Sequence, residues 1–162
     1  MEAPAPESLA QRLMKLQLVR DPLKRIDALN AEAWELRYVN AALALEIAQH
    51  TRVESSQLHY KPGEARAWHI LGVAHALQSN HQQAQEDLQL AYDGYAALLD
   101  RHSQTEATAN IATVYQLMGQ YDIALEWQFR ALRLSEELSI MAVVGNTLTN
   151  IGIIYAEIEQ YD

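Results

Sequence analysis

The amino-acid sequence predicts an all-α protein built as a solenoid, in which antiparallel helix hairpins stack one on the next. Two observations support this prediction. Apolar residues recur at helical spacing along most of the chain, and a pattern of small and apolar residues repeats with a fixed step of 40 residues. We expect about three hairpins followed by a terminal unpaired helix, because each hairpin leaves an apolar face that the next one covers.

The 40-residue step is visible in several sets of positions. An apolar residue followed by a small one recurs as Leu71-Gly72, Ile111-Ala112 and Ile151-Gly152. Alanines keep the same step at Ala44, Ala84 and Ala124. The repeats are therefore predicted to occupy residues 23–162, in units of about 23–60, 61–102 and 103–142 and a half unit of 143–162.

Residues 1–22 precede the repeats as an N-terminal segment, which we expect to be partly disordered or to form a leading helix. It begins with an acidic stretch of Pro and Ala, from Met1 to Glu7, that lacks the basic and apolar parts of a signal peptide. Export therefore has no support. The unit that follows is a degenerate first hairpin, whose apolar residues are Trp34, Leu36, Tyr38, Leu43, Ala44 and Ile47.

The two full units are predicted to be helix hairpins. In the unit 103–142, Val114 and Leu117 belong to the apolar face of a first helix, and Gly119 follows as a left-handed cap residue. After a turn at 120–122, apolar residues return at helical spacing, so a second helix packs back on the first.

Small residues mark the places where two helices are predicted to approach closely. Gly inside a helix destabilises it by up to about 1 kcal/mol relative to Ala. We therefore expect Gly72 and Gly152 to allow a close contact between helix backbones that stabilises the hairpin by more than this amount. Ala112 holds the equivalent position between them. Replacing either glycine by Leu should disrupt its hairpin.

The half unit 143–162 opens a helix whose partner is missing from the sequence. Ile154, Ile158 and Tyr161 are then expected to lack the helix that covers them. We therefore expect either that the polypeptide is a piece of a longer protein, or that this open C-terminal helix docks on a second copy in a homodimer.

Composition narrows the classes of partner. The chain has 12 basic and 21 acidic residues, a formal net charge of −9 and no cysteine. No Lys/Arg stripe is available to displace counterions from phosphates, so we expect no binding to nucleic acid or to a membrane surface. No apolar run approaches the roughly 20 residues of a membrane span. The absence of cysteine excludes disulfides and thiolate metal sites, and fits a cytoplasmic location.

One unit carries a characteristic set of residues at fixed spacing: Trp68, Leu71, Gly72, Ala84, Leu88 and Ala91, with His75 at a position where Tyr is usual. The chain therefore resembles the tetratricopeptide repeat (TPR) family, in the long 40-residue variety of kinesin light chains, spindle-orientation adaptors and bacterial signalling modules. The resemblance implies a right-handed superhelix whose first helices line a concave face that binds proteins or peptides.

The same resemblance places side chains just before and after the Leu-Gly pair in the groove. They are Arg66, His69, Ile70 and Val73 in the first full unit, Glu106, Ala109, Asn110 and Thr113 in the next, and Asn146, Thr149, Asn150 and Ile153 in the last. Long-repeat relatives place Asn directly before this pair, as Asn110 and Asn150 are here, where its amide bonds an extended peptide backbone. Ile70 departs from that pattern. The alternative is that these Asn side chains only bond neighbouring turns of the array.

No pattern in the sequence predicts catalysis, a metal site or a cofactor. His69, His75 and His81 are spaced by six, which leaves successive side chains about 120° apart around a helix rather than on one face. There is no HExxH motif, glycine-rich phosphate loop or GxSxG elbow. His75 is expected to be a satisfied interhelix side chain, and the tryptophans to be packing residues without a ligand: Trp34, Trp68 and Trp127.

Three functions stay open on this basis. The leading hypothesis is a non-catalytic scaffold that captures an extended or helical segment of a partner. The second is a sensory domain at the N-terminus of a larger bacterial signalling protein, such as a cyclase, kinase or transcription regulator. The third is a self-associating structural element. The acidic surface favours a partner of basic character.

Overall fold

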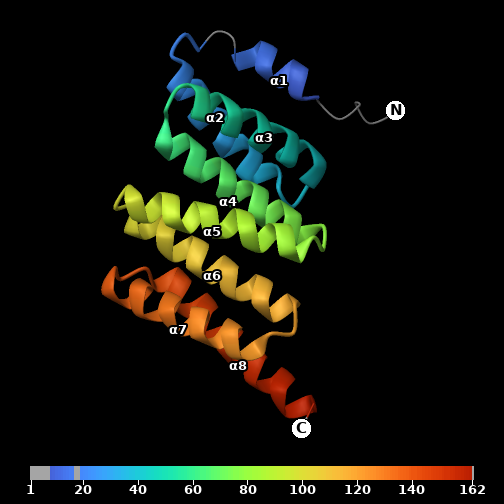
Figure 1. Ribbon diagram of the computed structural model, residues 1–162, viewed down its shortest axis with the longest axis vertical. Coiled ribbons are helices and arrows are strands. Elements are labelled where there is room, and N and C mark those ends of the chain that lie inside the picture. Colours follow the sequence, from blue (N-terminus) through green and yellow to red (C-terminus); the bar gives the residue numbers. More distant parts are fainter. Residues whose placement is uncertain (1–7, 17–18, 162) are drawn as a thin grey trace.

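The computed structural model describes residues 8–16 and 19–161, and these residues form eight helices without a strand. The helices follow one another along the chain (Figure 1) as α1 Leu9–Leu16, α2 Pro22–Leu36, α3 Ala41–Gln57, α4 Lys61–Leu77, α5 His81–Ala97, α6 Arg101–Leu117, α7 Tyr121–Glu137 and α8 Met141–Tyr161. The predicted all-α class is confirmed. Helix α1 lies in the N-terminal segment, of which residues 1–7 and 17–18 lie outside the described residues.

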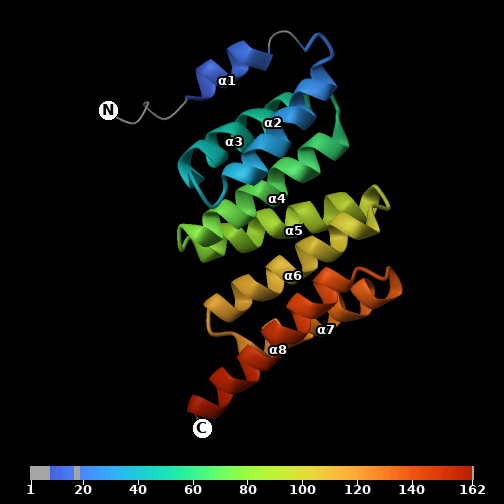
Figure 2. The same ribbon diagram turned by 180° about the vertical axis from the view of Figure 1, so that it is seen from behind.

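The helices stack in chain order as hairpins. Helices α2 and α3, α4 and α5, and α6 and α7 pack in pairs, and each pair also packs on the next, with α8 against α7 at the end. Figures 1 and 2 show this succession of layers along the long axis, with α1 and α8 at opposite ends. The first helices α2, α4, α6 and α8 also contact one another in order. They therefore form one continuous face.

A 20-residue spacing underlies the 40-residue step. Helices α3 to α7 are each 17 residues long and start 20 residues apart. The middle residue of each three-residue link has a positive φ: 53° at His59, 62° at Ser79, 58° at Leu99, 70° at Gly119 and 57° at Ser139. The residue after it donates its N–H to the carbonyl five residues back, as Asn80 does to His75 over 2.9 Å. Helices α3 to α7 thus end in a Schellman motif, and the cap role predicted for Gly119 is confirmed.

The close approach predicted at Gly72 is also present. A Cβ on this residue would lie 2.5 Å from Cγ of Leu88, so only glycine fits between α4 and α5 at this point. Leu88 in turn belongs to a core cluster with Ile111 and Val114 of α6. The side chain that seals one hairpin therefore also joins it to the next.

The last helix departs from two of the predictions. A Cβ on Gly152 would meet no atom within 4 Å, so Leu at this position would not disrupt packing among the described residues. Ile154 is fully buried rather than uncovered, because it repeats the position of Val114 and faces the rest of the array. Ile158 is half-buried, and the side chain of Tyr161 lies outside the described part. The exposed large apolar residues of α8 are instead Met141, Leu148, Ile153 and Tyr155.

By length and composition alone, α8 is apolar enough to cross a membrane over Met141–Glu159, which the sequence analysis did not anticipate. The run was missed because Asn146, Thr149 and Asn150 interrupt it without adding charge. A single helix of this kind does not by itself indicate a membrane protein, since helices of soluble proteins pass the same test.

Candidate functional site: a groove along the first helices

The face formed by the first helices is hollowed into a groove of about 390 Å³. Residues from α2 and the turn after it, from α4, from α6 and from α8 line it: Trp34, Arg37, Tyr38, Val73, Glu106, Ala109, Asn110, Thr113, Val143, Asn146, Thr149 and Asn150. The structure thus brings together eight of the twelve side chains that the resemblance placed in a groove. Val73 comes from α4, and the other seven from α6 and α8.

None of the other four predicted residues lines the groove. Ile70 and His69 are fully buried, so the expectation that they face a ligand directly is wrong. The cause is Trp34 of α2, whose ring lies over that of His69 with the centroids 5.0 Å apart. One step later the position of Trp34 is held by the small Ala74, which leaves the following helix open. Ile153 is exposed but lies outside the lining.

The fourth, Arg66, stands behind the α2 end of the groove. Its guanidinium carbon lies 4.2 Å from the centre of the Trp34 ring, and that of Arg37 lies 3.7 Å from the same ring. Arg66 also comes within 3.9 Å of Glu106, the one carboxylate in the described lining. This end of the groove therefore carries two positive charges against one negative charge, in contrast to the net charge of the chain.

Asn110 is held in place by a buried histidine. Its Nδ2 donates to Nε2 of His69 over 2.8 Å, and Nδ1 of His69 lies 3.3 Å from the Tyr95 hydroxyl. Because Nε2 accepts, His69 is neutral and carries its proton on Nδ1. Burial, together with the positive charges of Arg66 and Arg37, lowers the pKa of His69 to about 3. Asn110 thus bonds the array and lines the groove at once.

The same register position has different roles along the array. Asn30 lies two steps before Asn110 and is buried, where it donates to the carbonyl of Gly63 over 3.0 Å and accepts from Thr51 over 2.6 Å. Its role is structural. Asn150, one step after Asn110, is half-buried in the groove lining and makes no side-chain hydrogen bond to a described residue. Of the three, it is the amide most available to a ligand.

Sequence reasoning missed four residues of the lining: Trp34, Arg37, Tyr38 and Val143. The first three were missed because the register of the first hairpin was not fixed. A usable signal was present, since two steps of 40 back from Asn110 lead to Asn30 and so align α2 with the other first helices. Val143 carries no polar group that marks it, and only the packing of α8 turns it to the groove.

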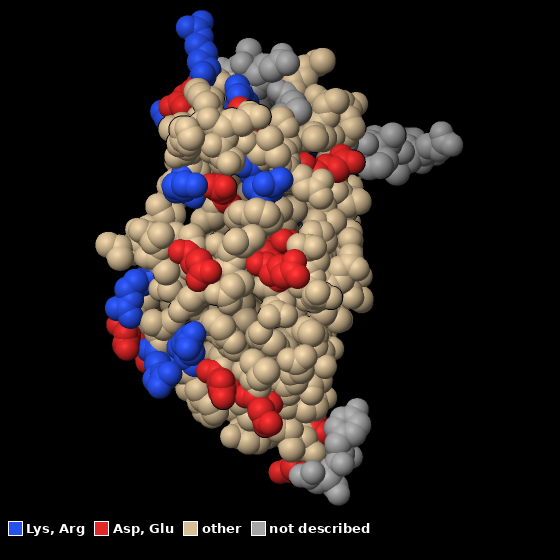
Figure 3. Space-filling model, viewed as in Figure 1, with Lys and Arg blue, Asp and Glu red and all other residues tan. Residues whose placement is uncertain are grey.

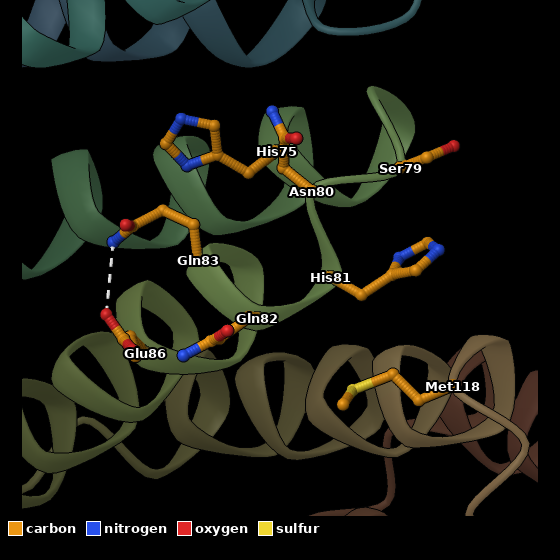
Figure 4. A pocket seen from close by; sticks show the side chains of 8 residues that line it. All are labelled: His75, Ser79, Asn80, His81, Gln82, Gln83, Glu86 and Met118. Carbon is orange, nitrogen blue, oxygen red and sulfur yellow. Dashed lines mark hydrogen bonds between the residues drawn. The ribbon is translucent and has the colours of Figure 1, made fainter.

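A second hollow lies at the turn between α4 and α5 (Figure 4), lined by His75, Ser79, Asn80, His81, Gln82, Gln83, Glu86 and Met118. Nδ1 of His75 donates to the carboxylate of the buried Asp87 over 2.7 Å, so His75 is the satisfied interhelix side chain that was predicted. Figure 4 shows the Ser79 hydroxyl pointing away from His75. Among the described residues, no group of three or more His, Cys, Asp or Glu is placed to hold a metal ion.

The comparisons with known proteins agree with this geometry. Residues 105–139, which cover most of α6 and α7, match the family model described as tetratricopeptide repeat. This segment of the chain is therefore similar to a tetratricopeptide repeat, as its residues indicated. No curated protein sequence matches it.

A solved structure has the same fold. The crystal structure of aspartyl phosphate phosphatase F from Bacillus subtilis matches with a TM-score of 0.83 and 16% sequence identity. The match covers 94% of this chain but only 40% of the phosphatase chain. The chain therefore spans less than half the length of that structurally similar protein. At this identity the likeness shows the fold alone.

Proposed function

We propose that the protein is a non-catalytic scaffold that binds an extended segment of a partner protein in the groove. The observation that carries this proposal is the convergence of polar side chains from several helices on one hollow, with Asn110, Asn146 and Asn150 among them. An amide both donates and accepts, which suits the alternating groups of an extended backbone. TPR folds generally serve as protein-interaction scaffolds, and the lining contains no arrangement of nucleophile, base and acid.

The charge in the groove favours an acidic side chain in the bound segment. Arg37 and Arg66 flank Trp34 at the α2 end, and Glu106 balances only one of them. The expectation of a basic partner rested on the net charge of the whole chain. We now propose an acidic group in the bound segment instead, because the charges nearest to a ligand in the groove dominate its electrostatic energy.

The test uses a phage-displayed library of random 12-residue peptides selected on the purified protein. Peptides enriched on the native chain should lose about tenfold or more in affinity for Asn150→Ala, since each lost hydrogen bond to a buried segment costs about 1 kcal/mol or more. The matched control is Asn80→Ala, an exposed amide outside the groove. Equal binding to both variants would remove the groove from the proposal.

Asn110→Ala separates ligand binding from stability. It also removes the donor to His69, so it should lower the free energy of unfolding by about 1 kcal/mol as well as weaken the peptide. Asn150→Ala should leave stability unchanged. A loss of stability in Asn150→Ala comparable to that in Asn110→Ala would assign both amides to the array itself.

A second candidate function is that of a sensory or regulatory part of a larger bacterial signalling protein. The observation in its favour is that this chain covers 40% of a phosphatase chain with the same fold. The coding sequence beyond codon 162 tests it: an open frame into a cyclase, kinase or regulator domain supports this function, and a stop codon there removes it.

We further propose that the protein is cytoplasmic and that nucleic acid and membranes are not its partners. Figure 3 shows Lys and Arg interspersed with Asp and Glu on one face, without a basic stripe that would follow a row of phosphates. Labelled duplex DNA and vesicles containing phosphatidylserine are the probes for this proposal. Binding of either at physiological salt would contradict it.

A further inference from the structure

Helix α8 presents three faces to its surroundings, and one of them is uncovered. Thr147, Ile151 and Ile154 form the buried face. Val143, Asn146 and Asn150 belong to the groove. The third face consists of exposed residues at helical spacing, namely Met141, Gly145, Leu148, Gly152, Tyr155 and Glu159. We call this third set the α8 stripe.

In the preceding repeats the equivalent face is covered by an antiparallel helix. On α4, Gly72 is closed by Leu88, and Ala65 lies against Gly94, so that a Cβ on Gly94 would be 2.9 Å from that of Ala65. The α8 stripe repeats these positions 80 residues later, with Gly145 at the place of Ala65. Leu148 and Tyr155 on it remain 53% and 49% exposed. The stripe thus has the form of a surface that receives a helix.

Two glycines in the stripe make no close contact with any described residue. A Cβ on Gly145 or on Gly152 would meet no atom within 4 Å. Gly145 also has no glycine counterpart, since Ala65 and Thr105 hold its position in α4 and α6. Glycine is among the poorest helix formers, so two unneeded glycines on one face of a helix indicate a close contact with something outside the described residues.

The order of the stripe is self-complementary under a two-fold rotation. Large and small residues alternate along it. At equal distances on the two sides of position 150, a large residue on one side corresponds to a glycine on the other, as for Leu148 and Gly152 or Tyr155 and Gly145. If two copies of α8 pack antiparallel about that point, Leu148 of each copy lies opposite Gly152 of the other, and Tyr155 lies opposite Gly145. A parallel arrangement in register would place Leu148 on Leu148. The antiparallel pair repeats the contact of Leu88 with Gly72 at four places.

The charges of the stripe agree with this arrangement. Its one charged residue, Glu159, would lie opposite Met141, at the first turn of the partner's α8. A carboxylate is stabilised at a helix N-terminus by the helix dipole and the free N–H groups. No two like charges face each other along the stripe.

We propose that two copies of this protein associate through the α8 stripe, as an isologous antiparallel pair of α8 helices centred on position 150. The dimer uses a surface separate from the groove, so it neither requires peptide binding nor blocks it. A single helix stripe buries less area than a standard protein interface, so association should occur in the micromolar range. Insertion of α8 in a membrane is less compatible with the stripe's neighbours, because Asn146 and Asn150 lie midway along the same helix.

The first experiment measures mass against concentration by sedimentation equilibrium of the full chain, from about 1 to about 300 µM. The native protein should pass from monomer to dimer. Gly152→Leu should weaken dimerisation by about tenfold or more by filling the space for Leu148. Its melting temperature as a monomer should not fall, because the new side chain meets open space. Glu126→Leu, on the exposed side of α7, is the matched control and should dimerise normally.

The second experiment tests the register and uses the absence of native cysteine. Chains with Gly145→Cys and chains with Tyr155→Cys should form a disulfide when mixed, but not when oxidised separately. The proposed pairing places unlike positions together and like positions ten residues apart, about 15 Å along the axis. A strict monomer at all concentrations, cross-linking of like positions, or binding of monomers to phosphatidylcholine vesicles through α8 would overturn the proposal.

Discussion

His69 is a neutral base sealed inside the array, between Trp34, Tyr95 and Asn110. Its pKa is about 3 in the folded protein, against 6.5 in an unfolded chain. Between these two values the unfolded state binds a proton at His69 that the folded state does not, so stability falls as the pH drops through 6.5 towards 3. At pH 5 the loss from this residue should be about 2 kcal/mol relative to pH 8.

Urea unfolding at pH 8 and at pH 5 measures this loss. His69→Gln keeps a donor and an acceptor but cannot titrate, so the difference in unfolding free energy between the two pH values should shrink by about 2 kcal/mol in the variant. His102→Gln, at an exposed histidine, is the control and should retain the native difference. An unchanged difference in His69→Gln would show that other groups cause the acid sensitivity.

Gln128 is the residue at which the array departs most from its own repeat. It is fully buried, and neither atom of its amide has a hydrogen-bond partner among the described residues. One step earlier the same position is Leu88, a core residue. Gln128→Leu should therefore raise the free energy of unfolding by about 1 to 3 kcal/mol, by removing an unsatisfied polar group from the interior.

The matched control for this substitution is Gln85→Leu. Gln85 donates to the Tyr115 hydroxyl over 2.7 Å, so its replacement should lower stability where that of Gln128 raises it. Both changes are measured by urea unfolding at one pH. A destabilised Gln128→Leu would mean that the amide is bonded in solution, for example through water.

At the scale of the helix, the links repeat the same backbone conformation with different residue types. All five three-residue links, between α3 and α8, place a residue in the left-handed region, but only Gly119 is a glycine. The link at Leu99 has φ of 58° and its side chain is 85% exposed, so a branched residue bears the strain there without a packing gain.

Exchanging residues at two links tests this account. Gly119→Ala should destabilise the protein by about 1 kcal/mol, although a Cβ there meets no atom, because the cost is conformational. Leu99→Gly should stabilise it by about 0.5 kcal/mol. Thermal unfolding measures both. The strain argument requires that the two substitutions change the stability in opposite directions. A Gly119→Ala variant as stable as the native protein would contradict it.

At the scale of the whole molecule, burial is uneven along the array. Helix α4 packs on α2, α3, α5 and α6 and has nine buried residues, whereas in the described part of the chain α8 packs mainly on α7 and, less extensively, on α6. In a repeat array each unit is stabilised by its neighbours, so the two helices should differ in local stability. Native-state hydrogen exchange should show amides of α8 exchanging at least about tenfold faster than those of α4. Uniform protection would show that the array unfolds only as one unit.

The same measurement connects to self-association. If α8 pairs with a second copy, its amides should become better protected as protein concentration rises, while those of α4 stay unchanged. Gly152→Leu should shift this dependence to protein concentrations about tenfold higher or more. This outcome distinguishes protection of α8 by a second copy, which depends on protein concentration, from protection by packing within one copy, which does not.

The sequence by itself determined the period, the helical class and several contacts. Gly72 was correctly placed at a close approach and Gly119 at a helix cap, because a missing side chain and a left-handed φ are local requirements that leave a local mark. The resemblance to the TPR family, rather than the period itself, indicated eight of the residues that line the hollow.

Only the tertiary structure decided which face of each helix is covered. Asn30, Ile70, Asn110 and Asn150 share one register, yet the first two are buried and the last two line the groove. Trp34 of α2 packs on the core cluster that contains Ile70, whereas the small Ala74 holds the equivalent position one step later. Helical spacing fixes the direction of a side chain on its own helix, but burial depends on the size of residues contributed by other helices, which the local pattern does not contain.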